Sequence, residues 1–190
     1  MTPVSVPQNR RAHERRSAVY VVILLLACLA LGWWVKTAVQ NATRQVSLNG
    51  INAAVPDGWL VQEGAGDLVF VVRNPQSLDQ LYRVTSLPAA TDMEVLAGNR
   101  SIARTRLDST YRVLEAAPIV FGGQDAYKVS FARADVDSPG LPAIIEGVDY
   151  YFAQNDRVMV LSLESNSETL ANVLPNFQKF VQSVSYDGGE

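Results

Sequence analysis

From Ala18 to Val35 the sequence reads AVYVVILLLACLALGWWV, a stretch without a charged residue. A helix rises about 1.5 Å per residue, so this stretch would span roughly 27 Å, close to the roughly 30 Å hydrocarbon core of a bilayer. A core helix of a water-soluble protein would normally keep a polar stripe, and this stretch has none. The sequence therefore predicts a single transmembrane helix over residues 17–36, which divides the chain into two unequal parts.

Basic residues flank this apolar stretch unequally. Four arginines precede it: Arg10, Arg11, Arg15 and Arg16. Only Lys36 follows it closely. Because Lys and Arg stay on the cytoplasmic side during insertion, the asymmetry predicts a cytoplasmic basic tail over residues 1–16. The C-terminal part would then lie outside the cytoplasm, at the surface of the cell membrane.

Aromatic residues mark both ends of the predicted span. Tyr20 lies near its start, and Trp33 and Trp34 lie near its end, beside Lys36. Amphipathic rings favour the headgroup region of a bilayer, so we expect these four side chains at the two membrane interfaces.

Two other interpretations of this segment remain open. The first is a cleaved signal peptide with a cut near Ala38 or Ala42, although bulky Trp33 and Trp34 stand where small residues are expected. The second is a lipoprotein, because the sequence LLAC that ends at Cys28 resembles a bacterial lipobox. Lipidation of Cys28 would replace the helix with acyl chains, but the residues that follow it are apolar rather than a polar tether.

Charge and residue usage limit what the C-terminal part does. Residues 41–190 contain 11 Lys and Arg against 18 Asp and Glu, a net charge of −7 that repels nucleic acid. The only histidine is His13 and the only cysteine is Cys28, so this part lacks the usual general bases, thiol nucleophiles and zinc ligands. Glu146 and Asp149 would point to opposite faces of a strand, which argues against an acid–base pair. The sequence predicts neither an enzyme nor a cofactor site.

Beyond a linker or helix extension at residues 37–45, the pattern predicts strands and two helices. The strands are expected at residues 46–51, 53–59, 59–62, 68–73, 80–87, 111–120, 124–134, 143–154 and 157–165. A capping box from Thr91 to Glu94 predicts the start of one helix, and another at residues 165–168 predicts the start of the last. Pro175 lies within the last helix and should kink or break it. This order indicates an α+β domain with a mainly antiparallel sheet, and residues 187–190 form a frayed tail.

The segment 46–59, with its Pro56-Asp57-Gly58-Trp59 turn, resembles the opening of PsbP-like and DcrB-like domains. A later helix, a strand pair around Gly122-Gly123 and a closing helix continue the resemblance over about residues 46–186. The resemblance implies an α/β/α sandwich that serves binding and assembly and has no shared catalytic site. It also implies that Trp59 anchors the turn or the core.

The first predicted helix carries Met93, Leu96, Ala97, Ala103 and Leu107 close to one face. Arg100, Arg104 and Arg106 fall elsewhere and, with Arg112, form the basic concentration of an acidic domain. Arginines on a helix face are most often simply solvated. The alternative is a docking patch for an acidic partner or for the membrane surface.

Two functions follow as hypotheses. The first is a non-enzymatic single-pass membrane protein whose external domain binds or stabilises another membrane protein, as an accessory subunit of a membrane complex. The second is a membrane-anchored or lipid-anchored module that binds a small ligand or an ion in a cleft of the sandwich.

Overall fold

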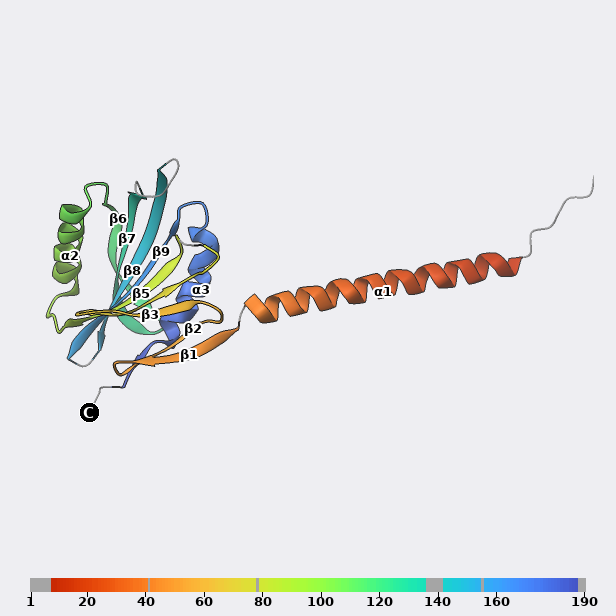
Figure 1. The fold of residues 1–190 in the computed structure, drawn as a ribbon, viewed down its shortest axis with the longest axis horizontal. Helices are drawn as coiled ribbons and strands as arrows, with labels where there is room; N and C mark the ends of the chain where they lie inside the picture. The colour runs from red at the N-terminus through yellow and green to blue at the C-terminus, as the bar shows by residue number, and fades with distance from the viewer. Residues whose placement is uncertain (1–7, 41, 78, 136–141, 155, 188–190) are drawn as a thin grey trace, which may run out of the picture. The chain divides into compact units, whose positions relative to one another are not determined.

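The computed structural model describes residues 8–40, 42–77, 79–135, 142–154 and 156–187, so residues 1–7 and 188–190 of the two predicted tails lie outside it. The chain forms two compact units, Met1–Ala42 and Thr43–Glu190. The first contains helix α1 (Gln8–Gln40), which is a single helix (Figure 1). Within it, Val19–Ala38 is long and apolar enough to cross a membrane. The predicted apolar helix is confirmed as a candidate span, and it continues into the predicted linker.

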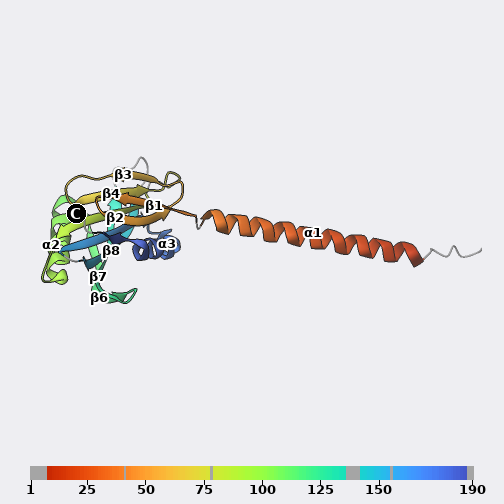
Figure 2. The ribbon, with the colours of Figure 1, turned by 90° about the horizontal axis from the view of Figure 1, so that it is seen from below.

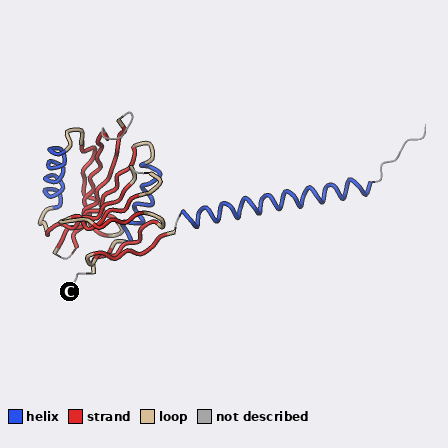
Figure 3. Tube along the Cα trace, viewed as in Figure 1, coloured by secondary structure: helices blue, strands red, loops and turns tan. Residues whose placement is uncertain are grey.

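The second unit contains ten strands and two helices among its described residues. In chain order these are β1 (Thr43–Leu48), β2 (Ile51–Pro56), β3 (Leu60–Glu63), β4 (Leu68–Arg73), β5 (Leu81–Pro88), α2 (Met93–Leu107), β6 (Arg112–Phe121), β7 (Gln124–Asp135), β8 (Ala143–Gln154), β9 (Arg157–Asn166), α3 (Leu170–Ser183) and β10 (Ser185–Tyr186). Figure 3 shows how the strands dominate this unit.

The strands form two antiparallel sheets. The larger has seven strands in the order β3-β4-β5-β9-β8-β7-β6, and the smaller has the order β1-β2-β10. Helix α2 lies on one side of the large sheet and α3 on the other (Figures 1 and 2). The predicted α+β sandwich with an antiparallel sheet is therefore confirmed.

The main core lies between the large sheet, α3 and β2. Phe177 and Phe180 of α3 are buried and place their rings 5.0 and 5.1 Å from that of Tyr82 on β5. Burial of one such side chain contributes about 1.5–3 kcal/mol. The ring of Trp59 packs 4.8 Å from Tyr82 on the same core, so this residue anchors the turn as the resemblance implies.

Both predicted capping boxes are wrong in detail. The N-cap of α2 is Asp92, not Thr91, and its carboxylate accepts hydrogen bonds from the backbone amides of Glu94 and Val95. A charged acceptor is favoured there because the start of a helix carries partial positive charge. Residues 165 and 166 still belong to β9, so α3 begins only after Thr169.

Helix α3 is continuous from Leu170 to Ser183 although Pro175 lies inside it, so the predicted break does not occur. Pro175 removes one bond, to the carbonyl of residue 171 near the first turn. The burial of Phe177 and Phe180 on the sheet outweighs that loss.

Candidate functional site

Helix α2 carries its arginines on the face that packs against the sheet. Met93, Ala97, Arg100 and Arg104 follow the helical period and are buried or half-buried, whereas Leu107 is 90% exposed. The prediction that Arg100 and Arg104 lie away from the core face was wrong. The cause is in the large sheet, which carries two buried carboxylates, Asp149 and Glu164, and the first of these accepts a hydrogen bond from Arg104.

The first carboxylate belongs to Asp149 in the middle of β8. Arg104 donates from Nη1 to its Oδ2 over 2.7 Å, and the exposed fractions of the two side chains are 20% and 1%. The Arg104 guanidinium also lies 5.0 Å from the ring centre of Phe131 and 5.7 Å from that of Tyr111. Burial acts to lower the pKa of Arg104, but Asp149, Tyr111 and Tyr151 together outweigh it and the pKa is raised. Arg104 is therefore a fixed cation of the interior.

The second carboxylate is Glu164 on β9, of which 5% is exposed. It accepts hydrogen bonds from Arg83 on β5 and from Arg133 on β7, the latter over 3.0 Å. Burial acts to raise the pKa of Glu164, but the two guanidinium groups outweigh it and the pKa is lowered. Glu164 thus bridges two cations from different strands.

These groups surround a hollow of about 210 Å³, here named the arginine pocket. Its lining comprises Arg83, Arg104, Leu107, Asp108, Tyr111, Phe131, Arg133 and Glu164. Close by, Oδ1 of Asp149 and the hydroxyl of Ser162 are buried without a hydrogen-bond partner among the described residues. Ser162 pairs in the sheet register with both Asp149 and Arg83. These two polar atoms without a partner among the described residues therefore lie in one row across the sheet with Arg83, which lines the pocket.

The other end of α2 borders a more open hollow of about 500 Å³, here named the acidic groove. It is lined by residues 91–94 at the start of the helix, 118–120 on β6 and 125–127 on β7. Asp92, Glu94 and Asp125 supply three carboxylates, and none of the described residues that line the groove is basic. Burial raises the pKa of Tyr127, and Glu94 and Asp92 add to this effect.

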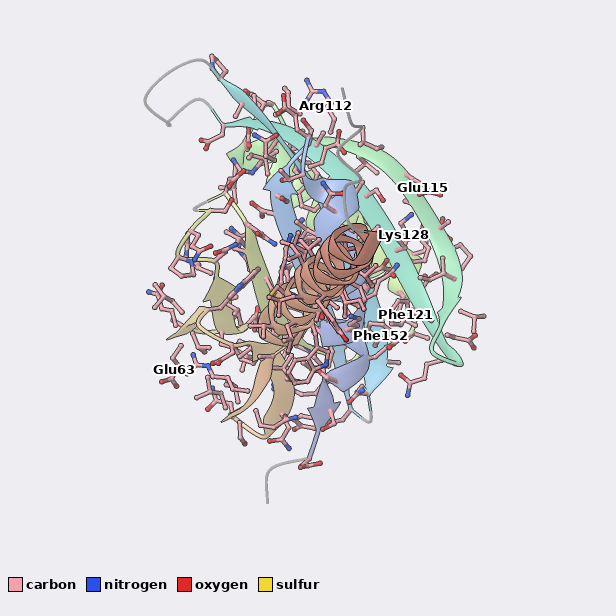
Figure 4. All side chains as sticks on the ribbon, turned by 90° about the vertical axis from the view of Figure 1, so that its right-hand side faces the viewer. Glu63, Arg112, Glu115, Phe121, Lys128 and Phe152 are labelled. Carbon is pink, nitrogen blue, oxygen red and sulfur yellow. The ribbon has the colours of Figure 1, made fainter. Side chains whose placement is uncertain are left out.

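A third hollow, the aromatic cleft, lies between the end of α3 and the turn from β6 to β7. It measures about 470 Å³, and its twelve lining residues include no charged side chain. Phe121 and Phe152 lie together in its wall, with ring centres 5.9 Å apart (Figure 4). Gln124, Gln154 and Gln182 supply amide groups around these rings.

The remaining predicted residues lie apart from these hollows. Tyr20, Trp33, Trp34, Lys36 and Cys28 are exposed on α1. The backbones of Arg10, Arg11, Arg15 and Arg16 belong to α1, and their side chains lie outside the described part of the structure.

Two predicted basic residues are on the domain surface. Arg106 is exposed on α2, so of the three predicted docking arginines it alone is fully available to a partner. Exposed Arg112 donates to the carbonyls of Ser109 and Tyr111. Glu146 and Asp149 do face opposite sides of β8, as predicted, because Asp149 pairs in register with Ser162 and Glu146 with Ser165.

Sequence reasoning missed Arg83, Arg133 and Glu164. Each interrupts a run of apolar residues within a strand, as in LYRVTSL around Arg83 and VLSLES around Glu164. A charged residue at a core-facing position rarely stands without a partner. That pattern was the available signal, but it does not say which strands become neighbours.

The fold resembles several solved structures. The solution structure of PsbP (CyanoP) from Synechocystis sp. PCC 6803 is 11% identical, with a TM-score of 0.59 over 76% of this chain and 92% of that one. The Ran-binding protein Mog1p of Saccharomyces cerevisiae is 13% identical, with a TM-score of 0.52 over 76% and 95%. A protein of Bacteroides thetaiotaomicron is 10% identical, with a TM-score of 0.53 over 78% and 49%.

No family model matches the sequence, and no curated protein matches it either. At such low identities the structural likeness concerns the fold alone. In chain order, an apolar helix that is a candidate for a membrane span is thus followed by a domain with a PsbP-like fold.

Proposed function

We propose that this chain is a single-pass membrane protein, inserted with its N-terminus in the cytoplasm, whose external domain binds a partner protein and is not an enzyme. The apolar helix and the arginines before it support the topology. The solved structures of this fold include a protein described as Ran-binding, which supports a binding role. The lack of histidine and cysteine after Cys28 supports the absence of catalysis.

The acidic groove is the observation that carries the partner-binding role. Its lining includes the apolar side chains of Met93, Pro118 and Val120, and Val120 is 73% exposed. Its three carboxylates have no basic counterpart in the lining. Charge complementarity therefore selects a partner segment that carries an apolar side chain next to Lys or Arg. Such a partner would be another protein of the same membrane.

The test is extraction of the full chain from its native membrane in mild detergent. We expect it to migrate in a larger assembly, and we expect Asp125→Lys to reduce the co-purified partner about tenfold, through the loss of one attraction and the gain of one repulsion. Glu63→Lys is the matched control, because Glu63 is exposed on β3, at the opposite edge of the large sheet from β6, as its distance from Glu115 of β6 in Figure 4 illustrates. A lone monomer, or equal losses with both variants, would contradict the proposal.

The aromatic cleft favours a second candidate function, the binding of a small neutral molecule. Its volume of about 470 Å³ lies in the range of ligand sites, and its aromatic walls and amide groups are typical of them. Native mass spectrometry of the purified chain would then show an added mass. That mass should vanish in Gln182→Trp, which adds a large side chain to the lining of the cleft, and remain in Asn172→Trp, which is exposed near the start of α3.

A further inference from the structure

We propose that the arginine pocket binds a small carboxylate with a single negative charge. This site lies at the opposite end of α2 from the acidic groove, and the inference does not rest on the proposed partner binding. Glu164 already shows the chemistry, because its carboxylate accepts from two of the pocket's guanidinium groups.

The pocket holds more donors than its own carboxylates use. A guanidinium group has five N–H donors in a planar fork that matches carboxylate oxygens. The bonds described above use one nitrogen each of Arg83, Arg104 and Arg133. Their side chains are 20–30% exposed and line the hollow, so a ligand that enters it meets donors from three different elements.

The charge balance selects a monoanion. Three guanidinium groups line the pocket against the carboxylates of Glu164 and Asp108, which leaves one positive charge. Thr110 donates hydrogen bonds to Asp108 and lowers its pKa, so Asp108 counts as an anion at neutral pH. Two charged groups outside the lining offset each other: Asp149 pairs with Arg104, and half-buried Arg100 lies one helical turn from Arg104 on the same face of α2. A carboxylate would neutralise the excess, whereas a phosphate dianion would reverse it.

The shape selects a short hydrocarbon chain on that carboxylate. At about 30 Å³ per water, the roughly 210 Å³ hold about seven water-sized groups. The rings of Tyr111 and Phe131 form an apolar wall, and exposed Leu107 stands at the rim. The ring of Phe131 packs over its register partner Gly147, where a Cβ would stand 2.3 Å from the Cζ of the ring.

The test is an NMR titration of the full chain in detergent micelles at pH 7.5, with butanoate as the probe and inorganic phosphate as the comparison. We expect butanoate to bind and Arg133→Gln to weaken it about tenfold, the usual effect of removing a charge-assisted hydrogen bond. Arg106→Gln, an exposed arginine on the same helix, should leave the affinity unchanged.

The decisive variant is Glu164→Gln. It removes the internal carboxylate that competes for Arg83 and Arg133, so it should tighten butanoate binding about tenfold. A variant that fails to fold cannot show this gain. Unchanged or weaker binding in Glu164→Gln, or tighter binding of phosphate than of butanoate by the wild type, would overturn the proposal. Neither result bears on partner binding at the acidic groove.

Discussion

Arg104 of α2 donates to Asp149 of β8 over 2.7 Å, and this ion pair fixes the helix on the sheet. The first half of α2 is held by apolar contacts, because Ala97 is fully buried in a second hydrophobic cluster and half-buried Met93 and Leu96 pack against the same cluster. The helix separates the acidic groove from the arginine pocket. The ion pair therefore fixes the end of α2 that borders the arginine pocket.

Breaking this buried pair should be costly. We expect Asp149→Asn and Arg104→Gln each to lower the free energy of unfolding by about 3–5 kcal/mol, because each leaves the other group buried without its partner. Lys128→Gln is the control, since it breaks the exposed pair with Glu115 and should cost less than about 1 kcal/mol (Figure 4). Urea denaturation followed by circular dichroism measures all three. Equal losses at the buried and the exposed pair would refute the structural role of Arg104.

The Glu164 bridge should make stability depend on pH. The pKa of Glu164 in the folded chain lies below its ordinary 4.5, so near that pH the unfolded chain binds the proton more readily. The contribution of Glu164 is thus complete above about pH 5 and is lost as the pH falls through the lowered pKa. Glu164→Gln should therefore be less stable than the wild type at pH 7, and the difference should shrink towards pH 3. A difference independent of pH would contradict this.

Gly147 should not tolerate a methyl group. A Cβ at this position would stand 2.3 Å from Cζ of Phe131 and 2.5 Å from the carbonyl oxygen of Leu163. We expect Gly147→Ala to destabilise the domain by about 1–3 kcal/mol, as other overpacked cores do. Gly98→Ala on α2 meets open space and should stabilise it by about 0.5–1 kcal/mol through helix propensity. Thermal unfolding of both variants measures these changes. A shift of the unfolding temperature in the same direction for both variants would contradict the close packing of Phe131 against Gly147.

The proposed orientation predicts one-sided labelling. In a Cys28→Ser background, a membrane-impermeant maleimide should label Ser109→Cys in intact cells and should reach Ser5→Cys only after lysis. The reverse pattern would invert the topology. The mass of the extracted wild-type chain adds an independent check, because an intact Met1 excludes both cleavage and lipidation at Cys28.

The fold could be predicted because its turns and periodicities are local signals. Asn49 and Gly50 both adopt positive φ at the β1–β2 hairpin, as an Asn-Gly pair in a tight turn predicts. The strand predicted over residues 46–51 ran across this turn and was wrong, because the chain reverses there and begins β2 at Ile51. The first residues of α2 and α3 were predicted wrongly, because several residues that can cap a helix stand in a row at each start. At α3 the long pairing of β9 with β8 delays the helix, which no local signal reveals.

The candidate site could not be predicted, because its residues come together only through non-local strand order. Arg83, Glu164 and Arg133 lie on β5, β9 and β7; in the sheet β9 lies next to β5, and β8 separates it from β7. Arg104 joins them from α2. Helical periodicity alone placed Arg104 on the exposed face of the helix. An arginine that faces a core is unfavourable unless it pairs with a buried carboxylate, as Arg104 does with Asp149.

Site-specific photo-crosslinking in the native membrane tests the central claim most directly. A photoreactive phenylalanine analogue at Val120, on the acidic groove, should capture a membrane protein through a segment with Lys or Arg beside an apolar residue. The same analogue at Leu60, which is 61% exposed on β3, serves as the control. The account predicts a discrete product at Val120 that Asp125→Lys abolishes and that Leu60 does not form. The same products from both positions, or a product at Val120 that Asp125→Lys leaves unchanged, would contradict it.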